Sequence, residues 1–189
     1  ISSRNRRPFA CDMDVSLLVP LMTRERYLLV RSRSRLLVRP STRRRSAPGA
    51  ARLPAFCWGV VDRLLAEDWS VDVVDDLSTG SLGNLASARA QPDRRFSFHR
   101  MDVSSPALVD LIAHRRPDIV FHLAAQMDVR VSVARPVFDA TINILGTLHV
   151  CEGAVAAGTK KVVLAASGGT LYGTTDELPI REGQPQVPE

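Results

Sequence analysis

Residues 70–80, SVDVVDDLSTG, decide the predicted fold, because they form a short apolar strand that ends in two carboxylates. The three valines in this stretch are β-branched, which is typical of a strand buried in a sheet. The strand ends at Asp75 and Asp76, and a polar turn follows. Such a carboxylate accepts hydrogen bonds from ribose hydroxyls in dinucleotide sites, and it caps helices or anchors loops in other sheets. The stretch alone leaves both interpretations open.

Strand-like and helix-like segments alternate on both sides of this stretch. The pattern predicts helices at 60–68, 82–90, 105–116 and 137–157, strands at 71–75, 95–99, 118–125 and 161–166, a loop at 126–135 and a turn at 167–173. This alternation predicts an α/β fold, a Rossmann-like doubly wound parallel sheet with helices on both faces. Right-handed crossovers then bring the carboxyl ends of the strands to one edge, where ligands bind in this architecture.

The longest predicted helix, 137–157, has apolar residues at helical spacing. Ile144, Leu148, Cys151 and Val155 keep this spacing, and Cys151 is interpreted as a residue of the helix core. Gly158 directly after the helix is a natural C-cap.

Charge divides the chain into two unlike parts. Residues 1–52 hold 13 arginines against 3 acidic residues, whereas residues 53–189 hold 12 basic residues against 17 acidic ones. An Arg- and Ser-rich, acid-poor leader is typical of a targeting peptide, a nucleic-acid arm or a disordered tail. We expect residues 1–58 to lie outside the fold and residues 59–189 to form a partial Rossmann-like dinucleotide-binding domain. The leader also fits an out-of-frame or mis-started translation joined to that domain.

Composition argues against two classes of protein. Inspection of the sequence finds no run of the ~18–20 apolar residues that a membrane span needs. The three cysteines show neither CxxC nor metal spacing and the four histidines do not cluster, so we expect no metal site. Scattered cysteines are typical of a reducing compartment, which favours the cytoplasm.

Five motifs in order resemble the NAD-dependent nucleotide-sugar epimerases and dehydratases, which are extended short-chain dehydrogenases, with the greatest likeness to UDP-glucose 4-epimerases. The motifs are VVDDLSTG (73–80), MDV (101–103), VFHLAAQMDVRVSVARP (120–136), INILGT (142–147) and VVLAASGGTLYG (162–173). The resemblance spans roughly residues 60–185 and implies an isomerase. Such an enzyme inverts a sugar 4-hydroxyl through a 4-keto intermediate, with tightly held NAD as cofactor and a nucleotide sugar as substrate. It also implies homodimers among full-length relatives.

The resemblance assigns cofactor-binding roles residue by residue. The implied cofactor-binding residues are Asp75, Asp76, Ser78, Thr79, Gly80, Asp102, Val103, Leu123, Ala124, Ala125, Gln126 and Asn143. Asp75 would hold the adenosine ribose, and Asp102 the adenine amine. Ala124 and Ala125 would bring bare backbone close to the pyrophosphate. Two carboxylates with no following arginine favour NAD over NADP, because a 2′-phosphate would meet repulsion on the order of a few kcal/mol.

Each assigned role has a structural alternative. By the resemblance, Ser167 supplies the catalytic hydroxyl, with Thr170 as the alternate because SGGT has one more residue than the common spacing. Ser167 also fits a strand-end turn and Asp102 a helix cap. Asn143 fits either a core amide or a tie to loop backbone or cofactor ribose. His122, inside an apolar strand, fits a packed core histidine better than a proton carrier.

The chain departs from the family pattern at both ends. In the window 46–65, Pro54 and Cys57 stand where the family has phosphate-binding glycines, so the first strand and its turn are degenerate. Tyr172 closes its loop and is not followed by lysine at the Tyr-x-x-x-Lys spacing of the family, so we expect an inactive fragment without the C-terminal substrate part. The alternative function is a non-catalytic α/β module whose basic leader contacts nucleic acid or a membrane. The leader has few aromatic residues for stacking on bases, which argues against a nucleic-acid partner.

Overall fold

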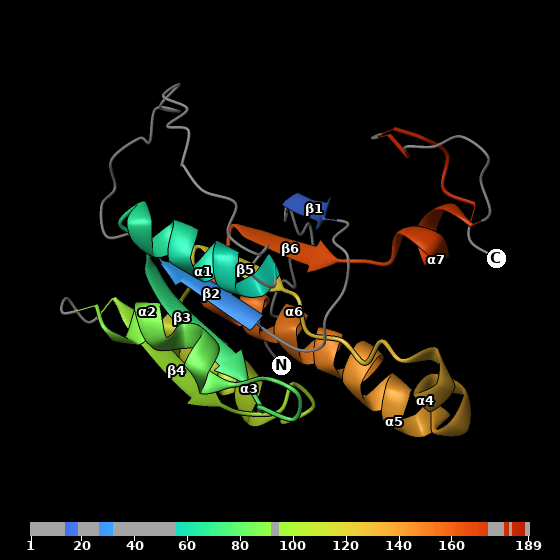
Figure 1. The fold of residues 1–189 in the computed structure, drawn as a ribbon, viewed down its shortest axis with the longest axis horizontal. Helices are drawn as coiled ribbons and strands as arrows, with labels where there is room; N and C mark the ends of the chain where they lie inside the picture. Colours follow the sequence, from blue (N-terminus) through green and yellow to red (C-terminus); the bar gives the residue numbers. More distant parts are fainter. Residues whose placement is uncertain are drawn as a thin grey trace, which may run out of the picture.

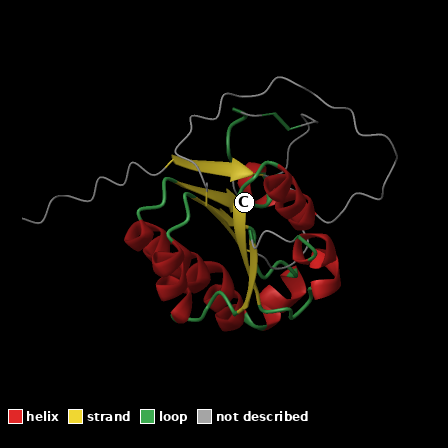
Figure 2. Cartoon of the chain, turned by 90° about the vertical axis from the view of Figure 1, so that its left-hand side faces the viewer, coloured by secondary structure: helices red, strands yellow, loops and turns green. Residues whose placement is uncertain are grey.

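The structure, a computed structural model, describes residues 14–18, 27–31, 56–91, 95–173, 180–181 and 183–187. These residues form a mixed six-stranded sheet with helices on both faces (Figures 1 and 2). The α/β class and the Rossmann-like layering predicted from the sequence are therefore confirmed.

The strands follow one another along the chain as β1 (Asp14–Leu18), β2 (Tyr27–Arg31), β3 (Ser70–Asp75), β4 (Phe96–Arg100), β5 (Ile119–His122) and β6 (Lys161–Ala165). The helices are α1 (Phe56–Ala66), the 3-10 turn η1 (Leu82–Leu85), α2 (Ala86–Arg89), α3 (Ala107–Arg115), α4 (Val129–Ala134), α5 (Pro136–Ala140), the π-helical turn η2 (Thr141–Leu145), α6 (Gly146–Ala157) and α7 (Gly168–Tyr172). Each helix and strand predicted between residues 60 and 166 has a counterpart, with ends shifted by a few residues.

The strand order is β1-β6-β5-β2-β3-β4. The pairs β3–β4 and β5–β6 are parallel, whereas β2 runs antiparallel to both β3 and β5. The four strands predicted from the sequence are therefore all parallel to one another, and the antiparallel β2 comes from the leader, where no strand was predicted. Backbone groups of β3 and β5 face a gap of one strand width, and an antiparallel segment satisfies them at least as well as a parallel one.

Two of these strands come from the leader that we expected outside the fold. β1 pairs in parallel with β6, and β2 lies between β3 and β5. Helix α1 also begins before the expected boundary, at Phe56. The structure therefore differs from the expectation over residues 14–18 and 27–31. Pro54, one of the residues at the expected glycine positions, lies outside the described residues.

The sheet is covered by two apolar cores, one on each face. On one face, α1, η1 and α2 pack on the sheet through buried residues that are Val61, Leu65, Val71, Val73, Leu85 and Ala88. On the other face, α3 and α6 enclose Val74, Val103, Leu108, Ile112, Val120, Ala124, Ile142, Val150, Ala154 and Val162. Burial on both faces explains why the strands are nearly continuous apolar runs.

Helix α6 approaches its neighbours closely because two of its inward positions are glycines. A Cβ at Gly146 would lie 2.5 Å from Val103 Cγ2, and a Cβ at Gly153 would lie 2.8 Å from Ile112 Cβ. At the end of the helix, Gly158 adopts φ +68 and caps it, as the sequence predicts.

The predicted apolar spacing of this helix is wrong about the core. Ile144, Leu148 and Val155 are exposed by 63%, 54% and 46%, and Cys151 is also exposed. The helical stretch Pro136–Ala157 is long and apolar enough, with a hydropathy of 1.2, to cross a membrane by length and composition. Inspection of the sequence missed this. The face of this helical stretch opposite Ile144, Leu148 and Val155 packs on α3 and the sheet, as expected for a core helix.

Two segments predicted as loop or turn contain short helices. Helix α4 lies within 126–135, and its N-cap Asp128 accepts a hydrogen bond from the Arg130 N–H. Three β-branched valines within α4 hide it from a propensity argument. Helix α7 begins directly after Ser167, whose hydroxyl caps it.

Candidate functional site

The pairing register brings the carboxyl ends of four strands to one edge of the sheet. Tyr27 pairs with Val74 on one side and with His122 on the other, and His122 pairs with Leu164. Asp75 pairs with Arg100. The residues that follow β3, β4, β5 and β6 therefore leave the sheet at the same edge, as Figure 1 shows for β5 and β6.

Asp75 is a buried carboxylate at the end of β3, with an exposed fraction of 3%. Its Oδ1 accepts a hydrogen bond of 2.7 Å from the Leu77 N–H. The next carboxylate, Asp76, accepts one of 2.8 Å from the Ser78 N–H. Leu77 adopts φ 62, a left-handed conformation that a leucine rarely takes. Ser78 and Thr79 are exposed beyond this tight turn.

Asp102 lies beside the end of β3, because the Met101 N–H donates to the Asp75 carbonyl at 3.3 Å. The Asp102 Oδ1 accepts hydrogen bonds of 2.7 Å from both the N–H and the hydroxyl of Ser104. The side chain thus forms a local turn, close to the cap role considered for it. Val103 is buried, and its carbonyl contacts His149 Nδ1 at 3.2 Å.

The loop after β5 is fixed by Asn143. Leu123 and Ala124 are buried and Ala125 is half-buried, so small side chains leave the backbone close to the edge. The Gln126 N–H donates to Asn143 Oδ1 at 2.7 Å, and Asn143 Nδ2 donates to the Gln126 carbonyl at 2.8 Å. Of the two roles open for Asn143, a tie to loop backbone is the one that these contacts form.

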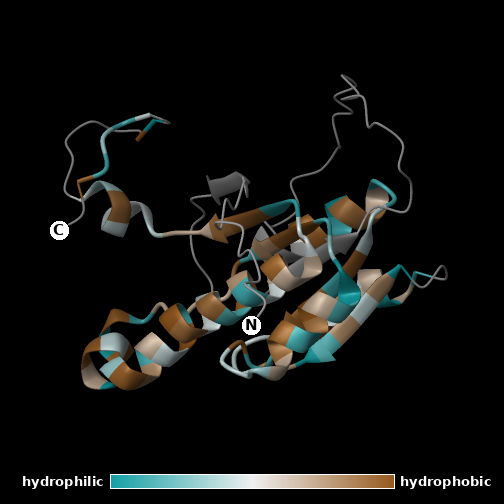
Figure 3. Cartoon of the chain, turned by 180° about the vertical axis from the view of Figure 1, so that it is seen from behind, coloured by the Kyte–Doolittle hydropathy of each residue, from teal (hydrophilic) through white to brown (hydrophobic). Residues whose placement is uncertain are grey.

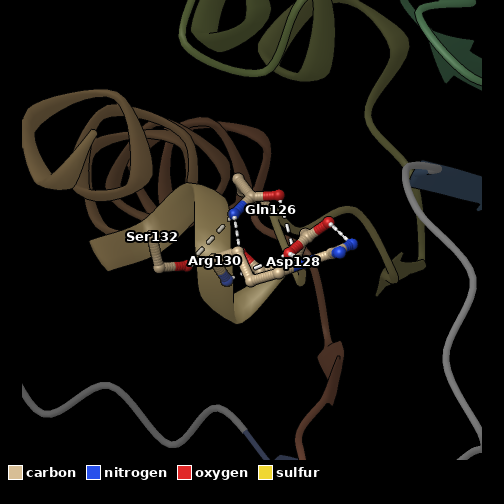
Figure 4. A network of polar contacts seen from close by, with 4 residues as sticks. All are labelled: Gln126, Asp128, Arg130 and Ser132. Atoms are coloured by element: carbon tan, nitrogen blue, oxygen red, sulfur yellow. Dashed lines mark hydrogen bonds and ion pairs between the residues drawn. The ribbon is translucent and has the colours of Figure 1, made fainter. Parts of the chain in front are cut away.

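The side chain of Gln126 holds the start of α4. Its Nε2 donates to the Asp128 carbonyl at 2.9 Å and to Ser132 Oγ at 3.0 Å, while the Asp128 N–H donates to Oε1 at 3.1 Å (Figure 4). Arg130 bonds both carboxylate oxygens of Asp128, at 3.2 and 3.0 Å, and this contact lowers the pKa of that carboxyl.

Ser132 connects this loop to the long helix. Its hydroxyl lies 2.6 Å from Asp139 Oδ1, and Asn143 Nδ2 donates to the same oxygen at 3.1 Å. The loop after β5, α4 and α5 are therefore held by one set of hydrogen bonds.

His122 is a buried histidine at the end of β5, with an exposed fraction of 3%. Its Nε2 lies 2.7 Å from Thr147 Oγ1 on α6. Burial lowers the pKa of His122 to about 4, so the ring is neutral at pH 7. This supports a core histidine rather than a proton carrier.

Ser167 and Thr170 follow β6 at the same edge. The Ser167 hydroxyl accepts a long hydrogen bond of 3.5 Å from the Thr170 N–H, as the N-cap of α7. Thr170 is exposed. The hydroxyl of Ser167 therefore stands at the start of α7 as a cap, which is one of the two interpretations given for it.

The edge has features that fit a dinucleotide. A buried carboxylate at the end of β3 suits ribose hydroxyls, and the two alanines after β5 allow close approach of phosphates. Helix α1 packs along β3 and is followed at once by it, so its first turn lies at the same edge. Within the described ranges, no three His, Cys, Asp or Glu side chains are grouped as metal ligands.

Sequence reasoning missed two parts of this site. Thr147 and Ser132 both bond residues of the edge, and neither was among the predicted site residues. The spacing of Asn143 and Thr147, one helical turn apart, was the available signal. The π-helical turn η2, which contains Asn143, has no sequence signature.

Comparison with protein families finds one matching model. The model described as GDP-mannose 4,6 dehydratase matches residues 59–189. The matched segment begins one residue after the leader and contains all residues predicted for the edge.

Individual relatives match the same segment. The chain is 44% identical over 129 residues to a UDP-glucose 4-epimerase of Mycolicibacterium smegmatis, covering 68% of this chain and 41% of the relative. It is 34% identical over 129 residues to a putative UDP-glucose 4-epimerase of Methanocaldococcus jannaschii, covering 68% of this chain and 40% of the relative. The chain thus spans about two fifths of the length of these relatives.

Solved structures agree with the fold. The UDP-glucose 4-epimerase of Thermotoga maritima, solved with UDP-glucose, matches with a TM-score of 0.59 at 34% identity, over 70% of this chain and 41% of that one. The UDP-glucose 4-epimerase of Thermus thermophilus, in complex with NAD, matches with a TM-score of 0.59 at 33% identity, over 69% of this chain and 40% of that one.

Proposed function

Because this chain belongs to the family of NAD-dependent nucleotide-sugar epimerases and dehydratases that the GDP-mannose 4,6 dehydratase model describes, we propose that residues 59–189 form the NAD-binding unit of a UDP-glucose 4-epimerase-like enzyme. The similarity to UDP-glucose 4-epimerases, including one solved with NAD, supports this choice within the family.

One observation carries the proposal. The buried carboxylate of Asp75 lies at the carboxyl edge of the sheet, and the loops with Asp102 and with residues 124–126 leave the sheet at that same edge. In an open α/β sheet this edge is the place for a dinucleotide. Asp75 would accept hydrogen bonds from the adenosine ribose, and Asp102 would receive the adenine amine.

The residues of this chain would bind and orient the reactants. Bound NAD supplies a hydride acceptor and donor for the sugar carbon. Ala124 and Ala125 leave room for the cofactor backbone, and Gln126 begins the loop over the substrate. The Ser167 hydroxyl would hydrogen-bond the sugar 4-oxygen and share its proton, which is general acid–base work at hydrogen-bond range. The reaction would pass through a 4-keto sugar.

We extend the proposal to cofactor binding without turnover by these 189 residues. Neither Tyr27 nor Tyr172 is followed four residues later by lysine, so the Tyr-x-x-x-Lys base of the family is not among them. Binding of NAD, and not epimerisation of UDP-galactose, is therefore the activity to measure.

The partners follow from the same proposal. The substrate would be a nucleotide sugar, and the exposed apolar residues Ile144, Leu148 and Val155 on the long helix support self-association as a homodimer. The scattered cysteines, without CxxC spacing, favour a reducing compartment such as the cytoplasm. The alternative, a basic leader acting as a nucleic-acid or membrane arm, is less well supported because β1 and β2 of that leader lie in the sheet.

Titration of the 189-residue chain with NAD and NADP by isothermal calorimetry tests the proposal. We expect NAD to bind and NADP to bind more weakly, and Asp75→Asn to weaken NAD binding about tenfold, the equivalent of one charged hydrogen bond. The matched control is Asp118→Asn, which makes the same change before β5 at the opposite edge of the sheet. Absence of NAD binding to the wild-type chain, or equal weakening by both substitutions, would contradict the proposal.

A further inference from the structure

We propose that His122 and Thr147 are positioning residues for the cofactor loop, acting through Asn143 on the backbone of Gln126. This inference rests on the proposed function, because that loop lies at the edge proposed for NAD. It adds Thr147, for which no role was predicted, and it gives the core histidine His122 of β5 a positioning role.

The direction of the hydrogen bonds follows from the single proton of the Thr147 hydroxyl. That proton goes to the Asn143 carbonyl, at an Oγ1···O distance of 2.7 Å. Thr147 Oγ1 must then accept from His122 Nε2, which lies 2.7 Å away. The neutral ring of His122 therefore carries its proton on Nε2 and donates it to Thr147.

The series of hydrogen bonds continues from Asn143 to the loop after β5. Both amide atoms of the Asn143 side chain are engaged by the Gln126 backbone, at 2.7 and 2.8 Å. A buried strand, a helix and a loop are thus linked in the order His122, Thr147, Asn143, Gln126. Packing fixes the position of Thr147 in this series of hydrogen bonds, since α6 contacts Val103 through the neighbouring Gly146.

The backbone at Asn143 needs such a hold, because it lies in the π-helical turn η2. The Gly146 N–H donates to the Thr141 carbonyl five residues back, instead of the usual four. In this widened turn the Thr147 hydroxyl donates to the Asn143 carbonyl, which gives that backbone an additional hold. The turn then directs the Asn143 amide at Gln126.

Burial keeps His122, the first residue of this hydrogen-bond series, in one protonation state. His122 is almost fully enclosed, and the lowered pKa of about 4 means that it stays neutral across the physiological range. A neutral donor of fixed tautomer suits a positioning role, because its hydrogen bond does not change with pH above 5.

Amide hydrogen exchange measured by NMR on the 189-residue chain tests the inference. Thr147→Val keeps the shape of the side chain and removes its hydroxyl, and Thr147→Ser keeps the hydroxyl. We expect Thr147→Val to speed exchange of the Gln126 N–H about tenfold, as loss of one hydrogen bond predicts, with Val120 and Val150 unchanged. His122→Phe should act in the same direction, and Thr147→Ser should behave as the wild type.

Three results would overturn the inference. The first is an unchanged exchange rate at Gln126 in Thr147→Val. The second is equal acceleration at Gln126, Val120 and Val150, and the third is the same effect from Thr147→Ser, since either of these would show a packing role alone. NAD affinity is measured in parallel and should fall about tenfold in Thr147→Val. If the wild-type chain binds no NAD, the proposed function fails while the exchange data still decide whether this chain of hydrogen bonds holds the loop.

Discussion

The long helical stretch that runs through α5, η2 and α6 has two faces of opposite character. The inward face, which packs on α3 and the sheet, carries Ile142, Gly146, Val150, Gly153 and Ala154. The outward face carries larger apolar side chains, Val137, Ile144, Leu148 and Val155, which are exposed by 80%, 63%, 54% and 46%. In Figure 3 much of the ribbon at α4 and α5 is brown, the colour of hydrophobic residues.

The two glycines and the alanine distinguish the inward face, because valine and isoleucine occur on both faces. Small residues on the inward face let α6 approach so closely that a Cβ at Gly153 would lie 2.8 Å from Ile112 Cβ. Large residues on the outward face have no such neighbour among the described residues. The inward face is therefore the one sensitive to added volume.

The largest expected effect comes from filling the inward face. Gly153→Val should lower the free energy of unfolding by about 3 kcal/mol, because the added carbons overlap Ile112 on a helix that cannot retreat from the sheet. The control is Ala156→Val, an exposed position on the same helix, which should change stability by about 0.5 kcal/mol through helix propensity alone. Urea unfolding followed by circular dichroism measures both. Equal effects would show that the two faces do not differ in packing.

The same difference explains how far the sequence could predict this fold. Periodicity correctly placed the helix over 137–157, yet Ile144, Leu148 and Val155 drew attention to the outward face. Glycine contributes little to a hydrophobic pattern, so the inward positions Gly146 and Gly153 carried no signal. Their importance depends on Val103 and Ile112, which are distant in sequence, and only the tertiary structure reveals such contacts.

Part of the candidate site could likewise be predicted from the sequence, and part could not. The ends of β3 and β5 at one edge were predictable, because alternating strands and helices with right-handed crossovers allow few topologies. The antiparallel strand β2 was not, since it fills a gap that the sequence pattern of the leader does not reveal. The link from His122 to Thr147 was also hidden, because it depends on the register between β5 and α6.

A smaller effect on the free energy of unfolding is expected from protonation of His122, which lies on β5 under the long helix. His122, which bonds Thr147, has a pKa of about 4 in the folded chain against 6.5 in an unfolded one. The unfolded state therefore binds the proton more tightly, so this contribution to stability is complete above pH 6.5 and is lost as the pH falls toward 4. Between pH 7 and pH 5 the loss should be about 2 kcal/mol.

Urea unfolding at pH 7, 6 and 5 measures this slope. His122→Phe should remove it, because no proton is taken up at that position on unfolding. The exposed His114→Gln substitution is the matched control and should leave the slope as in the wild type. A wild-type slope that persists in His122→Phe would assign the pH dependence to other groups.

The smallest effect on folding is expected on the outward face. Leu148→Lys and Ile144→Lys should each change the free energy of unfolding of the monomer by no more than about 0.5 kcal/mol, because both side chains already face solvent. Sedimentation equilibrium should nevertheless show weaker self-association, since a lysine there would bring like charges together in a homodimer. Ser87→Lys, an exposed position on α2 across the sheet, adds the same charge and should leave association unchanged. A loss of stability above about 2 kcal/mol in Leu148→Lys would instead mean that the outward face is packed within the monomer, and the contrast between the two faces would no longer hold.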